Sequence, residues 1–246
     1  MKKLFFILLI TAIWLPLSTK TNAQSLRFGF KAGVGVAKFN YKSDTAPDSL
    51  DFFEFYSGPR NTDNASFKPS YSVSGVVEYD VSKVLFLSSG LQANLKFSQF
   101  KVQSGYARDK NKYRFNVLYL QVPVTVHYRT GKFFLGAGGY GAWAVSGKWK
   151  NDVQNDGSIF QNISGKLEFG NDSENSNLER FDYGIRGEVG FGIKRLRLSL
   201  TFDQGLAKLK ASNGQQKTPT NFSPLETGTL RNQAIYATAT YYWLAK

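Results

Sequence analysis

Apolar and polar side chains alternate along most of this 246-residue chain once the first two dozen residues are passed. The segment 85–97 shows the alternation most clearly. One of its faces carries Leu85, Leu87, Leu91, Ala93, Leu95 and Phe97, and the other carries Ser88, Gly90, Gln92, Asn94 and Lys96. A period of two residues is typical of a β-strand whose two faces meet different environments. The pattern therefore predicts an all-β fold with one apolar surface and one polar surface.

The first 23 residues have the organisation of a secretory signal peptide. Two lysines form a basic start, residues 4–17 are largely apolar, and Ala23 is a small residue at the expected cleavage position. We expect cleavage between Ala23 and Gln24, which leaves one exported domain over residues 24–246. An uncleaved membrane anchor is the alternative, but the apolar stretch is shorter than the roughly 20 residues that a spanning helix needs.

Charge and cysteine content restrict the partners and the source of stability. The chain has a formal net charge of +13, and removal of the three lysines of the signal peptide leaves +10. Export argues against nucleic acid as a partner, so we expect the charge to meet phosphate-bearing outer-membrane lipid or lipopolysaccharide. The chain has no cysteine, so disulfides do not stabilise the domain. No apolar run after residue 23 is long enough for a membrane helix, so a spanning structure must use strands.

Eight strands can be predicted from the alternation. They are residues 27–41, 67–79, 84–101, 113–129, 133–150, 180–193, 196–208 and 231 to the C-terminus. The turns after the second, fourth and sixth strands are very short. The other links are longer and polar, at 42–66, 102–112, 151–179 and 209–230. Outer-membrane barrels have an even number of strands, short periplasmic turns and longer external loops. We therefore predict an eight-stranded antiparallel transmembrane β-barrel in the outer membrane of a Gram-negative cell.

Aromatic residues near the strand ends fit the two interfacial girdles of such a barrel. The predicted periplasmic girdle contains Phe28, Tyr79, Tyr128, Phe133 and Trp243, and the predicted external girdle contains Phe97, Tyr113, Trp149 and Phe181. A soluble β-sandwich or a lipocalin-like barrel is the alternative, but it explains neither the girdles nor the unequal turns. Pro123 lies in the middle of a predicted strand, where it removes a ladder hydrogen bond, and we expect a local bulge there.

Charged residues on the polar faces predict an ion-paired interior. The residues that would form this network are Glu78, Lys96, Arg186, Glu188, Arg197 and Asp203. Both signs of charge occur, so they can pair with one another inside the barrel. The interior of an eight-stranded barrel is just wide enough for side chains to fill it. A wide water channel is therefore not expected.

The sequence contains few candidate catalytic residues. His127 is the one histidine, and it lies on the polar face close to the periplasmic turn, whereas lipid-modifying barrel enzymes place their sites at the opposite end. Ser82 is the nearest serine in the turns, but a nucleophile and its base must be within hydrogen-bond reach. We therefore predict no enzymatic activity, no catalytic residue and no cofactor.

The sequence also contains few candidate metal sites. One histidine and no cysteine are too few ligands for a transition metal. The acidic residues of the first and third long links leave calcium binding as an open alternative, although their spacing matches no known calcium loop. These acids are Asp44, Asp48, Asp51, Glu54, Asp63, Asp152, Asp156, Glu168, Asp172, Glu174 and Glu179. The aromatic run 52–56 in the first link could pack on the barrel mouth or bind a partner.

Five segments resemble, in order, strands of the Bacteroidetes outer-membrane β-barrel family often labelled PorT-like or "porin family". They are GFKAGV (29–34), YLQVPV (119–124), FLGAGGY (134–140), YGIRGEVG (183–190) and FDQGL (202–206). The resemblance implies an outer-membrane barrel, in a family whose namesake is tied to secretion and gliding machinery. No motif places the chain in the namesake branch. The chain also departs from the family at its end, because Trp243 is followed by three further residues where many such barrels end on Phe or Tyr.

These observations lead to one functional expectation and two alternatives. We expect a non-enzymatic structural or interaction protein with a packed interior and external loops that bind a partner or a surface. Association with protein partners of an envelope or secretion complex would be consistent with the resemblance. The first alternative is a small-solute porin or transporter, and the second is a lipid-modifying enzyme of the outer leaflet.

Overall fold

The computed structural model describes residues 25–42, 66–103, 110–155, 158–170, 178–209 and 229–245. Within these residues lie nine strands: β1 (Leu26–Lys42), β2 (Ser66–Asp80), β3 (Leu85–Gln103), β4 (Lys110–Thr130), β5 (Phe133–Asn155), β6 (Ser158–Lys166), β7 (Phe181–Ile193), β8 (Leu196–Gly205) and β9 (Thr229–Ala245). The described residues contain no helix that is long and apolar enough to cross a bilayer.

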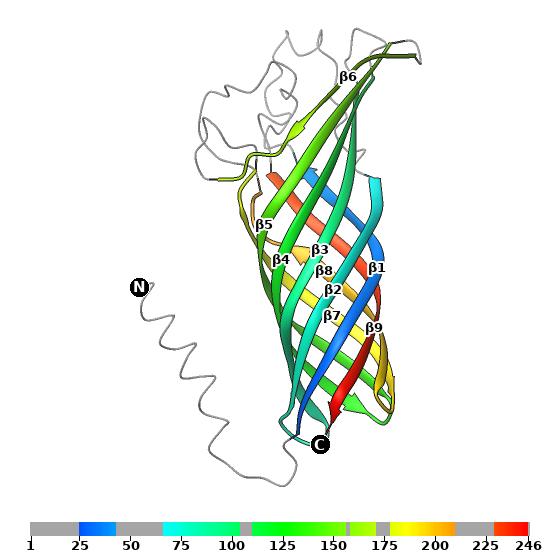
Figure 1. Cartoon of the computed structure of the whole chain (residues 1–246), viewed down its shortest axis with the longest axis vertical. Helices are drawn as coiled ribbons and strands as arrows, with labels where there is room; N and C mark the ends of the chain where they lie inside the picture. The colour runs from blue at the N-terminus through cyan, green and yellow to red at the C-terminus, as the bar shows by residue number, and fades with distance from the viewer. Residues whose placement is uncertain are drawn as a thin grey trace, which may run out of the picture.

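Eight of these strands close into a barrel, and each is antiparallel to both of its neighbours (Figure 1). The order around the wall is β1, β2, β3, β4, β5, β7, β8 and β9, and the pairing of β9 with β1 completes the ring. A closed wall leaves no strand edge unpaired, which a sheet in lipid requires. The prediction of an eight-stranded antiparallel barrel is confirmed.

The remaining strand, β6, lies outside this ring. It pairs with the last part of β5, from Lys148 to Asn155, so the two strands form a hairpin that continues past the barrel (Figure 1). The prediction that residues 151–179 form one polar link is therefore wrong for its first half. Residues 158–166 are not part of the closed wall, and their sequence lacks the regular alternation that reveals the other strands.

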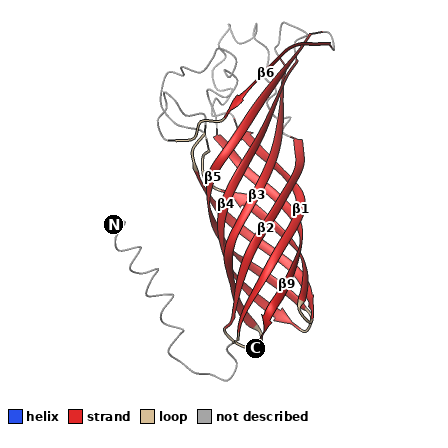
Figure 2. Cartoon of the chain, in the orientation of Figure 1, coloured by secondary structure: helices blue, strands red, loops and turns tan. Residues whose placement is uncertain are grey.

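The short connections gather at one end of the barrel, together with the C-terminus (Figure 2). We call this the turn end, formed by residues 81–84, 131–132 and 194–195, and the opposite end the loop end. Gly131 and Lys194 have φ values of 61° and 54°, the left-handed conformation that two-residue hairpin turns need. In outer-membrane barrels in general, the short turns face the periplasm and the longer loops face the cell exterior.

Burial in the wall is the reverse of that in a soluble protein. Outward side chains are apolar and exposed, such as Val189, which is 50% exposed. Inward side chains are polar and buried, such as Asp182 and Asp203, each 0% exposed. Exposed valine, leucine and isoleucine over the whole wall are stable only where lipid replaces water.

Aromatic side chains ring the outer surface near both ends. Phe133 and Phe191 lie near the turn end, with ring centroids 6.5 Å apart, and Trp243 is half exposed beside the same turns. Tyr71 and Phe97 meet edge to face at 6.4 Å near the loop end. Such rings match the interfacial girdles of a transmembrane barrel.

Trp149 does not belong to the external girdle, contrary to prediction. Leu118 pairs with Ser146, but Tyr119 pairs with Ala144, so Val145 is an extra residue in β5. This bulge reverses which side chains face inward beyond it. Trp149 consequently packs against the apolar cluster inside the barrel.

Pro123 is accommodated without the predicted bulge. Ser89 pairs with Val124 and Gln92 with Gln121 in the same register, and the two pairs between them are missing from the β3–β4 ladder. The Ser89 hydroxyl donates a hydrogen bond of 2.9 Å to the Pro123 carbonyl. The strand therefore passes the proline by leaving a short gap in the ladder.

Candidate functional site in the barrel interior

The interior charges nearest the turn end centre on Glu78 of β2. Its carboxylate accepts hydrogen bonds from the Arg197 guanidinium of β8 and from the Tyr242 hydroxyl of β9. Arg27 Nη2 of β1 lies 3.5 Å from Glu78 Oε2. The Arg197 guanidinium also lies over the Phe86 ring of β3, with its carbon 4.5 Å from the ring centroid. This cluster joins five strands of the wall through one buried carboxylate.

A second carboxylate, Asp80, lies at the edge of the same end. It pairs with Arg27 and with Arg129 of β4, whose Nη2 atom is 3.1 Å from Oδ1. Arg129 also lies over the Phe86 ring, at 4.7 Å. Three arginines and two carboxylates therefore close the turn end of the interior.

Glu188 of β7 forms the next layer toward the loop end. Lys31 Nζ of β1 lies 2.6 Å from its Oε1 atom, and the Ser199 hydroxyl donates to the same oxygen at 2.5 Å. His127 Nε2 lies 3.4 Å from Oε2. The His127 ring also stacks on Phe86, with centroids 4.5 Å apart and planes 3° apart. The single histidine is thus packed among interior side chains.

Ser82 has a different environment. Its hydroxyl accepts hydrogen bonds from the backbone amides of Val84 and Leu85, at 3.3 and 3.0 Å, and so caps the turn between β2 and β3. His127 instead contacts Glu188 and Phe86 in the interior. These contacts assign both residues to packing and turn formation.

Five side chains in the middle of the barrel form a closed ring of hydrogen bonds. Arg186 donates two bonds of 2.7 Å to Asp203 and one of 3.0 Å to Gln92. Gln92 donates to Asn94 and Asn94 donates to Gln121, each at 2.7 Å. Gln121 returns to Asp203 at 3.1 Å. This hydrogen-bond ring connects β3, β4, β7 and β8 across the interior.

Lys96 lies on the loop-end side of this ring and is 0% exposed. Its Nζ atom has no hydrogen-bond partner among the described residues and lies over the rings of Tyr119, at 5.3 Å, and Tyr140, at 5.8 Å. The nearby Asp182 accepts hydrogen bonds from Asn232, at 2.9 Å, and from Tyr140, at 3.4 Å. Lys96 is therefore held by aromatic faces and not by a direct ion pair.

Buried apolar side chains fill the loop end of the interior, and we call them the apolar plug. Its members are Phe39, Phe115, Val117, Tyr119, Tyr140, Ala142, Ala144, Leu167, Leu178, Ala207, Leu209 and Leu230. Three of these leucines come from chain outside the strands, and backbone hydrogen bonds fix that chain in the mouth of the barrel. The Leu167 amide donates to Gly147 at 3.0 Å, and the Leu209 amide donates to Leu230 at 2.9 Å.

Polar side chains of the described residues fill these layers, and most of them are buried. A cavity of about 20 Å³ lies between Lys31, Arg186 and the ladder gap at Pro123. That volume holds roughly one water molecule. The interior is therefore a packed polar core beneath an apolar plug.

The six residues predicted for the interior network lie there in the structure, each less than 10% exposed. Arg186 pairs with Asp203 and Arg197 with Glu78. Lys96 has no direct ion pair with a described residue, and Glu188 pairs with Lys31.

Several interior charges are absent from the predicted network, namely Arg27, Lys31, Asp80, Arg129 and Asp182. The strand alternation identifies their faces, since Lys31 stands between outward Phe30 and Ala32. Sequence periodicity does not give the partner on the far wall, which depends on how the strands are staggered.

The remaining candidate positions divide between described and undescribed chain. Ala23, Gln24, the aromatic run 52–56 and most of the acidic residues considered for calcium lie outside the described residues. Asp152 lies in β5, not in a loop, and pairs with Arg114. No group of potential metal ligands is found in the described part of the chain.

Comparisons with known proteins agree with this architecture. A family model described as "Outer membrane protein beta-barrel domain" matches residues 22–211. The curated proteins include no match to the chain.

Three solved structures are similar to the chain at low sequence identity. The Neisserial surface protein A (NspA) is 10% identical, with a TM-score of 0.41, over 88% of this chain and 97% of that one. The attachment invasion locus protein Ail of Yersinia pestis, solved in complex with a heparin analogue, is 12% identical, with a TM-score of 0.32, over 91% and 100%. OprG from Pseudomonas aeruginosa is 14% identical, with a TM-score of 0.30, over 89% and 94%.

Proposed function

Because the chain belongs to the outer membrane protein beta-barrel domain family, we propose that it is a sealed outer-membrane barrel that acts as a structural or interaction protein. Its outer surface and its loop end, not a transport path through its centre, carry the function. In this proposal, the protein is exported by its N-terminal signal peptide and has no enzymatic activity. It presents its loop end to the cell exterior, where a partner or a surface can bind.

The filled interior is the observation that carries this proposal. The apolar plug covers the loop end, and the hydrogen-bond ring of Arg186, Gln92, Asn94, Gln121 and Asp203 crosses the middle. A hydrated solute would have to displace both layers. Breaking one partner of a buried ion pair costs about 3–5 kcal/mol, which opposes spontaneous opening. These layers argue against the small-solute porin alternative.

The contacts of His127 argue against the enzyme alternative. Its ring stacks on Phe86, and its Nε2 atom faces Glu188 in the interior. A base that acts on outer-leaflet lipid must reach the substrate, and the apolar plug lies between His127 and the loop end.

Conductance measurement tests the proposal directly. Purified protein refolded in detergent is inserted into a planar lipid bilayer, with an open porin inserted in parallel as the positive control. We expect no steady current from the protein under conditions where the porin conducts. Steady ion currents from folded wild-type barrels would contradict the sealed interior.

Association with an envelope complex is the second part of the proposal. It is supported by the hairpin of β5 and β6, which extends past the wall, and it is consistent with the resemblance to a family whose namesake is tied to secretion machinery. Chemical cross-linking in intact cells, followed by purification of the barrel, tests it. Recovery of a stoichiometric envelope protein is the expected result, and recovery of the barrel alone would contradict it.

A further inference from the structure

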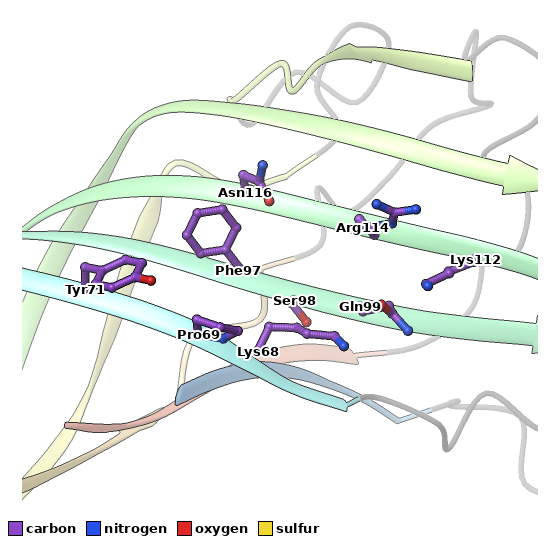
Figure 3. A pocket seen from close by; sticks show the side chains of 9 residues that line it. All are labelled: Lys68, Pro69, Tyr71, Phe97, Ser98, Gln99, Lys112, Arg114 and Asn116. Atoms are coloured by element: carbon purple, nitrogen blue, oxygen red, sulfur yellow. The ribbon is translucent and has the colours of Figure 1, made fainter. Parts of the chain in front are cut away.

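A groove of about 380 Å³ opens near the loop end, where β2, β3 and β4 lie side by side (Figure 3). It is lined by the rings of Tyr71 of β2 and Phe97 of β3, which we call its floor, and by the cations Lys68, Lys112 and Arg114, which we call its rim. The groove lies on the wall of the barrel and is separate from the packed interior.

The groove results from a local irregularity of β2. Phe67 pairs with Ser98 and Ser70 pairs with Lys96, so two residues of β2 face one residue of β3. The second of the two, Pro69, has no amide hydrogen to donate to the ladder. A bulge of this kind bends the strand locally and re-aims its side chains. The groove lies at this bend of the wall.

The floor of the groove is continuous with the lipid-facing surface. Tyr71 is 51% exposed, and its ring meets Phe97 edge to face at 6.4 Å. One step toward the turn end on the same face of β2, Val73 is 50% exposed. Aromatic side chains of this girdle mark the depth at which acyl chains give way to headgroups. An acyl chain on the wall would therefore lead to this groove.

The rim of the groove has an excess of positive charge. Arg114 pairs with Asp152, and its Nε atom has no hydrogen-bond partner in the described part of the chain. Neither Lys68 nor Lys112 has an ion pair with any carboxylate in that part. Three cations are thus set against one carboxylate above an aromatic floor. Phosphate-bearing headgroups at this depth would neutralise the remaining charge.

We propose that this groove binds the phosphate-bearing headgroup of an outer-leaflet lipid, with the adjoining part of an acyl chain over Tyr71 and Phe97. The proposal rests on the orientation given under the proposed function, which places the loop end at the outer leaflet. Lys68 and Lys112 contact the phosphate from two neighbouring sides of the groove. The barrel therefore carries a specific lipid, in addition to the bulk lipid around its wall.

Native mass spectrometry of the detergent-purified barrel tests the lipid site. The probes are diphosphorylated lipid A, the same lipid A after phosphatase treatment, and inorganic phosphate alone. The test variant is Lys68→Gln/Lys112→Gln, and the matched control is Lys83→Gln/Lys132→Gln, which removes two exposed lysines at the turn end. Folding of each variant is checked by its β-sheet circular dichroism and its heat-dependent shift on gels.

The wild type and the control are expected to retain the phosphorylated lipid. The test variant is expected to bind it about 30-fold more weakly, because two cations near the anionic headgroup are lost. The dephosphorylated lipid is expected to bind the wild type as weakly as the variant, and free phosphate is not expected to compete. In the wild type, the phosphorylated lipid is also expected to protect Lys68 and Lys112 from acetylation.

Equal retention by the test variant and the wild type would overturn the proposal, and would leave the acidic link 43–65 as an alternative occupant of the groove. Competition by inorganic phosphate would show that the groove is a general anion site and does not bind a lipid. The result is independent of the conductance test. A conducting barrel that retains the lipid contradicts the sealed interior alone, and a non-conducting barrel without lipid preference contradicts this inference alone.

Discussion

Lys31 of β1 and Glu188 of β7 form an ion pair of 2.6 Å between two strands that are not neighbours in the barrel wall. The pair therefore crosses the interior and does not run along the wall. Both side chains are largely buried, at 13% and 8% exposure. Such a contact holds two non-neighbouring parts of the wall at a fixed distance, and its side chains occupy part of the interior.

Replacing Lys31 should reveal this cross-barrel contact. Lys31→Met leaves Glu188 as a buried carboxylate without its cation, which is expected to reduce the free energy of unfolding by about 3–5 kcal/mol. Guanidinium titration in detergent micelles measures the change. The double variant Lys31→Met/Glu188→Gln is expected to recover most of the loss, since no charge is then left unpaired. A single variant as stable as the exposed-turn variant Lys132→Gln would show that the contact contributes nothing.

Arg186 is expected to require its guanidinium group, not only its charge. Arg186→Lys keeps the charge but cannot form two parallel bonds to Asp203 and a third to Gln92. We expect a loss of about 2–4 kcal/mol in the same unfolding measurement. Arg195→Lys, at an exposed turn, is the matched control and should leave stability unchanged. Equal stability of the two variants would contradict the role of the hydrogen-bond ring.

Gly136 should be intolerant of a side chain because His127 occupies the adjacent space. A β-carbon at Gly136 would lie 2.2 Å from the His127 ring, whereas one at Gly187 meets nothing within 4 Å. Gly136→Ala is expected to destabilise the barrel by about 1–3 kcal/mol through overpacking, and Gly187→Ala to be neutral. The double variant Gly136→Ala/His127→Ala separates the clash from other effects. If the loss of stability in the double variant equals the sum of the losses in the two single variants, the clash with the His127 ring is not the cause.

The bulge at Val145 can be tested by fluorescence. Trp143 and Trp243 are each about half exposed on the lipid-facing wall, whereas Trp149 packs against the apolar plug. In bilayers of brominated lipid, single-tryptophan proteins should show strong quenching at Trp143 and Trp243 and weak quenching at Trp149. Deletion of Val145 restores the simple alternation and should expose Trp149 to the quencher. Strong quenching of Trp149 in the undeleted protein would contradict its inward position.

The wall of the barrel could be predicted from sequence because lipid imposes a strict rule on alternate residues. Val122, Val124 and Val126 all face outward, as their spacing requires. The rule fails where lipid does not act on the chain. It therefore missed β6, and it misplaced Trp149 because a single extra residue reverses the faces without changing the composition.

The interior was predictable in character but not in its pairings. The inward faces of Arg186 and Asp203 follow from alternation, and their contact follows from the adjacency of β7 and β8. The partner of Lys31 does not, because Glu188 lies 157 residues away on a strand that does not neighbour β1. The apolar plug was missed for a similar reason, since Leu167 and Leu209 belong to links that alternation does not describe.

The pairing of β1 with β9 has a consequence for the timing of folding. The two strands are joined from Arg27 and Ala245 to Lys42 and Thr229, so the first described strand of the wall finds one of its partners only in the last described strand. Until that seam forms, Lys31 and Glu188 have no fixed separation, and the charges that stabilise the finished cylinder stay in water. Closure of the seam between β1 and β9 therefore completes the wall and the charge pairs inside it in the same step.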